Sequence, residues 1–143
     1  MTYTKTVVIA AFASLLSAPV AGAKEDIKDV VICAVTEIHV CALHEGCKEL
    51  NPKEVNSIDF MRIDLKNMEL SGRRFDGTIG KVAIEKKTQL PKLLLLQGTK
   101  AEPDELEDGL AYSLAIHVET GRLAASVSST ETVYSMLGNC HAL

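Results

Sequence analysis

The chain has 143 residues, with 19 acidic and 15 basic side chains, three Phe, three Tyr and no Trp. Its net charge of −4 argues against nucleic-acid binding, whose affinity comes largely from neutralising phosphates. So few aromatic rings also argue against a platform that stacks sugars or bases. The length is enough for one domain with a modest core.

Residues 1–23 have the composition of a secretory signal peptide. Lys5 is the only charged residue in this stretch, residues 6–20 are mostly apolar, and a small-x-small cleavage pattern ends at Ala23. The apolar run is shorter than the roughly 20 residues that a membrane-spanning helix needs. We therefore expect a periplasmic or secreted protein without a membrane span, whose single mature β domain covers 24–143.

Four cysteines in an exported chain favour two disulfides, for which three connectivities are possible. Cys41 and Cys47 are separated by five turn-prone residues, so they can close a small loop. Cys33 then pairs with Cys140 and ties the start of the domain to its end. On the chain-entropy model the long loop contributes about 5 kcal/mol and the short one about 2 kcal/mol.

The same cysteines could instead bind a metal ion. Cys41, His44 and Cys47, together with Cys140 and His141, supply enough ligands for a zinc site. An oxidising compartment disfavours free thiolates, however, and the sequence lacks the Cys-x-x-Cys spacing of zinc knuckles and redox dithiols. We therefore expect no metal and no cofactor.

Residues 29–43 are rich in Val and Ile and fit two kinds of element. Val31, Cys33 and Val35 alternate as in a strand, whereas Val31, Val35 and Ile38 would lie on one face of a helix. The high content of β-branched residues favours the strand.

A series of short strands follows a polar connection at 48–56. The predicted strands cover 58–65, 68–70, 78–85, 93–96, the hairpin at 110–128, and 132–140. The run of four leucines at 93–96 predicts a strand that is covered on both faces. Seven or eight short strands with tight turns indicate an all-β, antiparallel up-and-down meander. At this length it closes into a small barrel or folds into a two-layer sandwich, stapled by the disulfides.

The hairpin at 110–128 is the clearest of these elements. Large apolar residues occupy every second position, and Gly121 supplies a turn residue that is free to take positive φ. The other face carries small residues, which are Ala111, Ser113, Ala115, Ala124, Ser126 and Ser128. We expect residues 29–43 to lie across this face, pinned there by Cys33–Cys140; the alternative is a flat surface that binds a partner.

Other polar clusters carry little chemistry. The acidic residues at 102–108 do not follow the ligand order of a calcium loop, so a solvated hairpin tip is expected. Lysines such as Lys86 and Lys87 more often protect a sheet edge than bind a ligand. No serine lies in a nucleophile turn, and His117 falls on the outer face of its strand. We expect no catalytic residues and no enzyme.

Several short motifs support a resemblance. They are the early cysteines, Met61–Leu65, Leu94–Gly98, Tyr112–Leu114, Thr120–Leu123 and the closing Gly138–Cys140. In these the chain resembles a group of uncharacterised small exported proteins of proteobacteria. It has a looser likeness, in size, compartment and strand number, to small periplasmic β-barrel inhibitors of lysozyme. The resemblance implies a location in the bacterial envelope and brings no ligand or activity.

These observations lead to one expectation about function and one alternative. We expect a monomeric, exported, non-enzymatic binding module that acts on an unidentified protein of the envelope, as an inhibitor or accessory protein. The alternative is a carrier of a small apolar ligand inside the barrel. The first requires a filled barrel, and the inward residues expected to fill it are Met61, Ile63, Leu93, Leu95, Tyr112, Leu114 and Ile116. A solvent-free interior pocket of roughly 300 Å³ or more would favour the carrier.

Overall fold

The computed structural model describes residues 29–55, 57–100 and 109–142, and these residues form an all-β fold. The predicted signal peptide at 1–23 and the acidic residues at 102–108 lie outside the described residues. Within the described part of the chain, no helix is long and apolar enough to cross a membrane.

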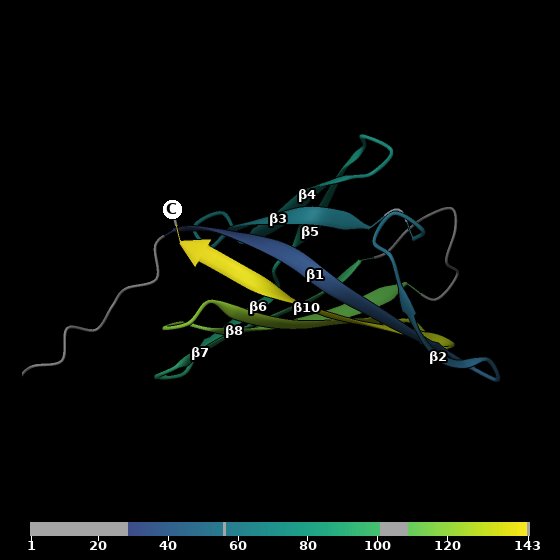
Figure 1. Cartoon of the computed structure of the whole chain (residues 1–143). Coiled ribbons are helices and arrows are strands. Elements are labelled where there is room, and N and C mark those ends of the chain that lie inside the picture. Colours follow the sequence, from purple (N-terminus) through teal and green to yellow (C-terminus); the bar gives the residue numbers. More distant parts are fainter. Residues whose placement is uncertain (1–28, 56, 101–108, 143) are drawn as a thin grey trace, which may run out of the picture.

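Ten strands in the described residues form one antiparallel sheet. They are β1 (Val30–Ala42), β2 (Gly46–Leu50), β3 (Ile58–Asp64), β4 (Glu69–Arg74), β5 (Ile79–Ala83), β6 (Lys86–Gln89), β7 (Leu93–Lys100), β8 (Leu110–His117), β9 (Arg122–Ser128) and β10 (Thr132–Ala142). The strand order is β5-β4-β3-β1-β10-β9-β8-β7-β6, with β2 paired to β1. The sheet curls into a half-barrel, in which β3–β5 lie opposite β7–β9 (Figure 1).

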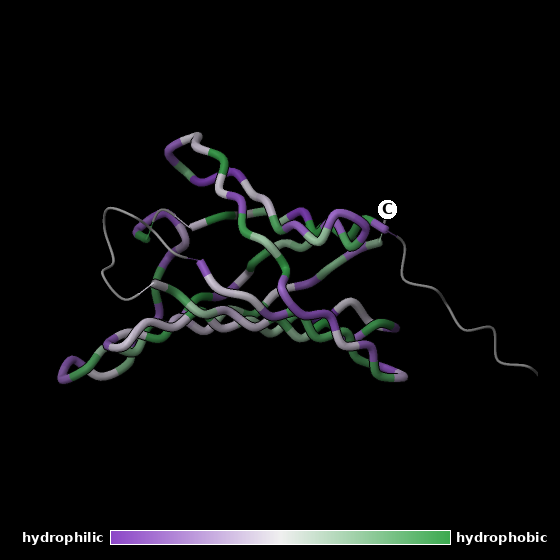
Figure 2. The backbone as a smooth tube through the Cα atoms, turned by 180° about the vertical axis from the view of Figure 1, so that it is seen from behind, coloured by the Kyte–Doolittle hydropathy of each residue, from purple (hydrophilic) through white to green (hydrophobic). Residues whose placement is uncertain are grey.

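This strand order confirms the predicted meander, because neighbours in sequence pair and the first strand pairs with the last. The two edge strands of the curled sheet, β5 and β6, are not joined to each other by a ladder of hydrogen bonds. There the short link after Ala83 crosses from one half of the curled sheet to the other (Figure 2). The protein is therefore one curled sheet, not a two-layer sandwich.

The predicted number of strands, seven or eight, was too low. The predicted connection at 48–56 overlaps β2, and β6 was also missed; both strands are polar and mostly exposed. Such strands bury no face, so they carry no alternation of apolar and polar residues. Backbone pairing with β1 and β7 holds them in place.

A β-bulge in β1 explains why its sequence also fitted a helix. The pairing with β10 shifts register between Val35 and Glu37, which leaves Thr36 as the extra residue. Val35 and Ile38 are both buried although they are three residues apart. Without the bulge, the period of two would place them on opposite faces. The bulge therefore produces a helix-like spacing inside a strand.

Both predicted disulfides are present, and each joins residues that lie directly opposite one another. Cys33 and Cys140 pair between β1 and β10, and Cys41 and Cys47 pair between β1 and β2. The path predicted for residues 29–43 was wrong, however. This segment forms an in-plane ladder with β10 and β3, where its backbone groups find partners, so it does not cross the hairpin face.

The turn at Gly121 is as predicted. Gly121 has φ of 71°, and its carbonyl accepts a hydrogen bond from the Cys140 amide at 2.7 Å. A Cβ at this glycine would lie 2.1 Å from the Cys140 carbonyl oxygen. The β8–β9 turn is thus packed backbone to backbone against β10.

The leucine run in β7 departs from the prediction of burial on both faces. Leu94 and Leu96 are fully buried on the concave side, whereas Leu93 and Leu95 lie half-buried on the outer side. Leu93 and Leu95 were therefore wrongly assigned to the barrel interior. A run of four apolar residues has no alternation from which the inward pair could be chosen.

Candidate functional site

The concave side of the half-barrel holds an open cleft of about 540 Å³. Strands from both halves of the curled sheet line it, and so does the connection before β3. Its apolar lining includes Met61, Leu70, Leu110, Leu114, Val127 and Met136. The cleft lies at one end of the half-barrel, which we call the cleft end.

The other end, which we call the packed end, has no such space. Its core contains Cys33, Ile63, Leu94, Leu96, Ile116 and Leu123, each at most 4 % exposed. None of these six residues lines the cleft. The expectation of a filled barrel therefore holds for one end only.

The inward-facing residues of β4 and β7 differ between the two ends in the same way. From the packed end outward, β4 places Leu70, Gly72 and Arg74 on the concave side, and β7 places Leu96, Gly98 and Lys100 there. Each series passes from leucine to glycine to a cation. These glycines are closely packed: a Cβ at Gly98 would lie 2.6 Å from the Tyr112 hydroxyl, and one at Gly72 would lie 2.8 Å from the Phe60 carbonyl oxygen. The terminal cation of each series resists full burial.

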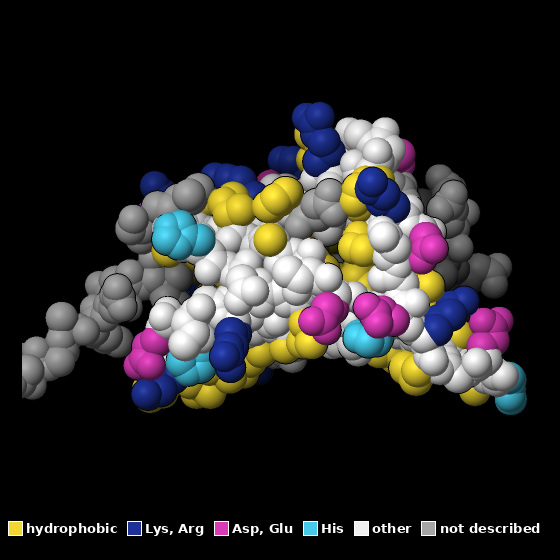
Figure 3. All heavy atoms as spheres, in the orientation of Figure 1, with side chains coloured by type: hydrophobic (Ala, Val, Ile, Leu, Met, Phe, Trp, Pro, Cys, Tyr) yellow, Lys and Arg dark blue, Asp and Glu magenta, His cyan; other side chains and the backbone are white. Residues whose placement is uncertain are grey.

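Arg74 is the last residue of β4 and is fixed by the turn that follows. Its amide donates to the Thr78 carbonyl at 2.8 Å, and its carbonyl accepts from the Gly77 amide at 2.9 Å. Its guanidinium lies over Gly80, where a Cβ would be 3.7 Å from Nε. Several Lys and Arg side chains project near this β4–β5 hairpin, at the top of Figure 3.

Lys100 is the last residue of β7, on the opposite half of the curled sheet. Partial burial lowers the pKa of its ammonium group, and the positive charge of Arg74 lowers it further. Arg74, Lys81 and Lys100 all line the cleft, and the Nζ atom of Lys81 lies 3.0 Å from Oε1 of Glu69. The described residues that line the cleft include no Asp, Glu or His.

Tyr112 forms part of the cleft wall beside Gly98. The two residues lie directly opposite on neighbouring strands, and a Cβ at Gly98 would be 2.6 Å from the Tyr112 hydroxyl. That hydroxyl donates a hydrogen bond to the Ala83 carbonyl at the end of β5. Burial, with a smaller contribution from the charge of Glu85, raises the pKa of Tyr112 to about 12. The hydroxyl therefore stays protonated and serves as a donor across the two halves of the sheet.

Glu85 strengthens the same junction between β5 and β7. Its carboxylate accepts from the Thr99 amide at 2.9 Å and from the Thr99 hydroxyl, and its amide donates to the Gln97 carbonyl at 2.9 Å. The hydrogen bonds from Thr99 hold the pKa of Glu85 below its usual value. These contacts join the two halves of the curled sheet at the place where no strand ladder connects them.

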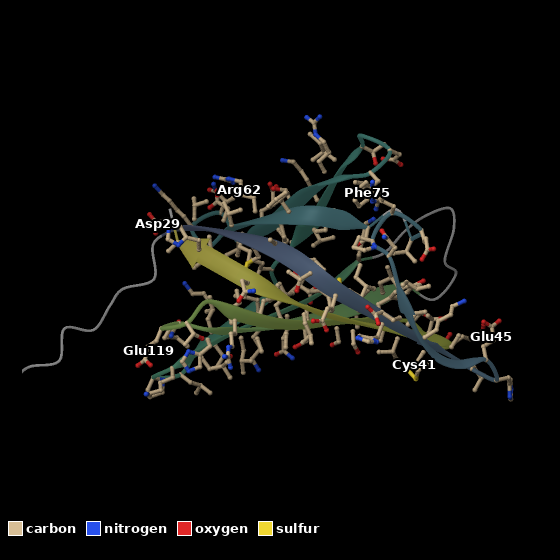
Figure 4. The ribbon with its side chains drawn as sticks, in the orientation of Figure 1. Asp29, Cys41, Glu45, Arg62, Phe75 and Glu119 are labelled. Atoms are coloured by element: carbon tan, nitrogen blue, oxygen red, sulfur yellow. A yellow bond between two sulfur atoms is a disulfide. The ribbon has the colours of Figure 1, made fainter. Side chains whose placement is uncertain are left out.

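The connection between β2 and β3 borders the cleft through Val55 and Ser57. Lys53 places its ammonium 5.7 Å from the centre of the Phe75 ring, a cation–π contact with the β4–β5 turn. Figure 4 labels Phe75 beside this connection. The contact fixes two borders of the cleft relative to each other.

The residues of the alternative metal site cannot supply the thiolate ligands that a zinc ion would need there. All four cysteines are in disulfides, which removes the thiolates that this site would need. Among the described residues, no three His, Cys, Asp or Glu side chains gather in a way that could hold a metal ion. His117 lies outside the cleft, where its Nδ1 accepts from the Thr120 amide at 3.3 Å.

The small-residue face of the β8–β9 hairpin is formed as predicted. Ala111 pairs with Ser128, Ser113 with Ser126, and Ala115 with Ala124, on the convex side of the sheet. β1 does not cover it, because β1 lies in the plane of the same sheet. The face continues onto β10 through Leu137, which is 45 % exposed.

Sequence reasoning missed Arg74, Lys100 and Tyr112 as residues of one site. A signal was present, since Leu-x-Gly-x-Arg ends β4 and Leu-x-Gly-x-Lys ends β7. No protein-family model, curated protein or solved structure matches this chain, so the chemistry of the cleft is the basis for inferring its function.

Proposed function

We propose that this protein is an exported, non-enzymatic carrier that holds a small, largely apolar ligand in the cleft of the half-barrel. The volume of about 540 Å³ is the observation that carries this proposal. Ligand pockets typically measure about 300 to 1,000 Å³ and are lined mostly by apolar side chains with a few polar groups. The cleft meets both conditions.

The wall chemistry favours binding over catalysis. General bases in enzymes are most often His, Glu or Asp, and the described lining residues contain none of them. The Tyr112 hydroxyl is held protonated, so it is a poor nucleophile at neutral pH. Two disulfides are typical of proteins outside the reducing cytosol, which supports an exported carrier.

Two measurements on the purified full chain test the proposal. Organic extraction followed by mass spectrometry should return a bound small molecule, and N-phenyl-1-naphthylamine, a neutral fluorescent probe, should bind in the cleft. Ala125→Leu should weaken binding of the probe, because Ala125 faces the cleft. Ala124→Leu is the matched control, since Ala124 is exposed on the opposite face of the same strand. An empty extract together with no probe binding would end the carrier proposal.

A second function is favoured by the small-residue face of the β8–β9 hairpin. Flat, uncharged rows of small side chains allow another protein surface to approach closely, and β1 leaves these rows uncovered. This feature supports the expected binding of an envelope protein. Affinity capture from an envelope extract should return a partner with the wild-type protein and with Ala125→Leu, but not with Ala124→Glu. Capture that is unaffected by Ala124→Glu would rule out this face as the contact.

A further inference from the structure

β5 is bonded to β4 along one side, and its other side is open. β5 ends the strand order of the sheet, and no strand in the described part of the chain pairs with this open side. The Thr78 carbonyl and the Ile84 amide, which flank β5, both bond to the β4 side at 2.8 Å. Because backbone groups alternate in direction along an antiparallel strand, those of Ile79 and Lys81 point away from β4. The open side of β5 therefore presents the N–H and C=O groups of these two residues.

The hydrogen bond at Ala83 agrees with this direction. Ala83 is the next residue in the same alternation, and its carbonyl accepts from the Tyr112 hydroxyl on β8. A donor that approaches from the open side thus reaches the backbone of β5. Ile79 and Lys81 continue the same row of backbone groups towards the β4–β5 turn.

The side chains of β5 leave its open side accessible. Ile79 is 62 % exposed, and Gly80 has no side chain. Lysines at sheet edges ordinarily keep other strands away. The ammonium of Lys81, however, lies 3.0 Å from the carboxylate of Glu69 on β4, which is the side away from the open one.

The other end of the sheet differs in this respect. β6 has only four residues, and two of them, Lys86 and Lys87, are exposed lysines. A short, charged strand of this kind discourages the addition of another strand. Of the two ends of the sheet order, β5 is thus the one suited to pairing.

The open side of β5 borders the cleft. Gly80, Lys81 and Val82 line the cleft there, and Leu110 and Leu114 line it from β8. A strand added beside β5 would point every second side chain in the same direction as Gly80 and Val82, which is into the cleft. Apolar side chains at alternate positions would then meet the apolar wall, while the added backbone bonds to β5.

We propose that the open side of β5 binds an extended segment of a partner protein as an additional strand, whose apolar residues at alternate positions enter the cleft. Repeated N–H and C=O groups at the spacing of a β-strand recognise another extended backbone, and a small ligand has no such repeat. This inference goes beyond the carrier function, because the backbone of β5 selects a polypeptide. The contact also lies apart from the small-residue face, which is on the convex side of the sheet.

Selection from a phage-displayed library of random twelve-residue peptides, with the full chain as bait, tests the chemistry of this partner. The enriched peptides should carry apolar residues at alternate positions. N-methylation of alternate backbone amides in one such peptide then shows which N–H groups bond to β5. One alternate set should weaken binding at least about tenfold, the typical effect of a lost hydrogen bond, and the other set should have no effect.

A substitution in β5 locates the contact. Ile79→Pro should weaken binding of the enriched peptides at least about tenfold, because proline has no N–H and its ring occupies the open side. The N–H of Ile79 does not bond to β4, so the ladder between β4 and β5 should stay intact. Ile79→Val is the matched control, since it keeps the N–H and a branched apolar side chain, and it should bind the peptides as the wild type does.

Thermal unfolding shows whether Ile79→Pro is folded. If it is not, the methylated peptides and the wild-type chain carry the test. An empty selection, enriched peptides without the alternation, or equal effects of the two methylation sets would each overturn strand addition at β5. Equal binding of the peptides to folded Ile79→Pro and to Ile79→Val would overturn it as well. None of these results bears on the carrier function, which the extraction and the binding of N-phenyl-1-naphthylamine decide separately.

Discussion

The packed end and the cleft end of the half-barrel are built from the same strands with the same alternation. At the packed end, inward positions of β7 hold Leu94 and Leu96, which are at most 1 % exposed. At the cleft end, the next two inward positions of this strand hold Gly98 and Lys100. Alternation thus decides which face a side chain takes, while its size and charge decide whether that face becomes core or cleft.

The largest difference between the two ends should come from the disulfides. Cys33–Cys140 belongs to the packed core and spans 107 positions of sequence, whereas Cys41–Cys47 spans six. Replacing Cys33 and Cys140 together by Ser should lower the free energy of unfolding by nearly 5 kcal/mol, because the unfolded chain gains most entropy when the longer loop is opened. The corresponding change at Cys41 and Cys47 should cost about 2 kcal/mol. Urea unfolding measures both, and a larger loss at the short loop would contradict this.

Replacing one leucine at each end by alanine compares how tightly the two ends are packed. Leu96→Ala should lower the free energy of unfolding by about 3 kcal/mol, because it leaves a cavity in a fully buried region. Leu110→Ala should cost only about 1 kcal/mol, since Leu110 is half-buried at the open cleft. Similar costs at the two positions, in matched urea titrations, would mean that the cleft end is as well packed as the core.

Two glycines, one beside Tyr112 and one in the cleft wall, should respond differently to an added methyl group. Gly98→Ala should cost about 2 kcal/mol, because its Cβ would meet the Tyr112 hydroxyl and the Ala83 carbonyl oxygen within 2.7 Å. Gly80→Ala should leave stability nearly unchanged, since the nearest atom to its Cβ is 3.7 Å away on Arg74. Thermal unfolding compares the two variants. A well-tolerated Gly98→Ala would show that Tyr112 moves aside at little cost.

A further effect should appear only at alkaline pH, and it reports on Tyr112. Its pKa is raised to about 12 in the folded protein, against an ordinary value of 10.0. The unfolded chain therefore loses this proton first, and stability falls as pH rises from about 10 towards 12. Titration of phenolate absorbance should show a component near 12 in the wild type that is missing in Tyr112→Phe. If that variant keeps the same late component, Tyr112 is not its source.

The parts of the fold that could be predicted from sequence depend on local chemistry. Two disulfides followed from four cysteines in a chain with a predicted signal peptide, and the β8–β9 turn followed from Gly121 between two alternating runs. The first prediction needs only the number of cysteines and the predicted signal peptide, and the second needs only the pattern within a short stretch of sequence. That residues 1–23 are a secretory signal peptide, and that residues 24–143 are exported, stay predictions.

What could not be predicted depends on register and on contacts between distant strands. The bulge at Thr36 and the polar strands β2 and β6 leave no clear periodicity. The cleft needs the inward series of β4 and β7 to meet across the curled sheet, a contact between residues that are distant in sequence. Arg74 and Lys100 therefore looked like ordinary cations at the ends of strands, although the repeated Leu-x-Gly pattern before each marks them in retrospect.

The disulfide between the first and last strands has a mechanical consequence. Cys33 lies near the start of β1 and Cys140 near the end of β10, directly opposite each other. Tension applied to the chain on either side of the fold would pass through this covalent bond. The residues from 34 to 139, which include the whole cleft, would then bear none of the pulling force. A protein tethered and stretched at both ends would keep the shape of its cleft until this single bond is reduced.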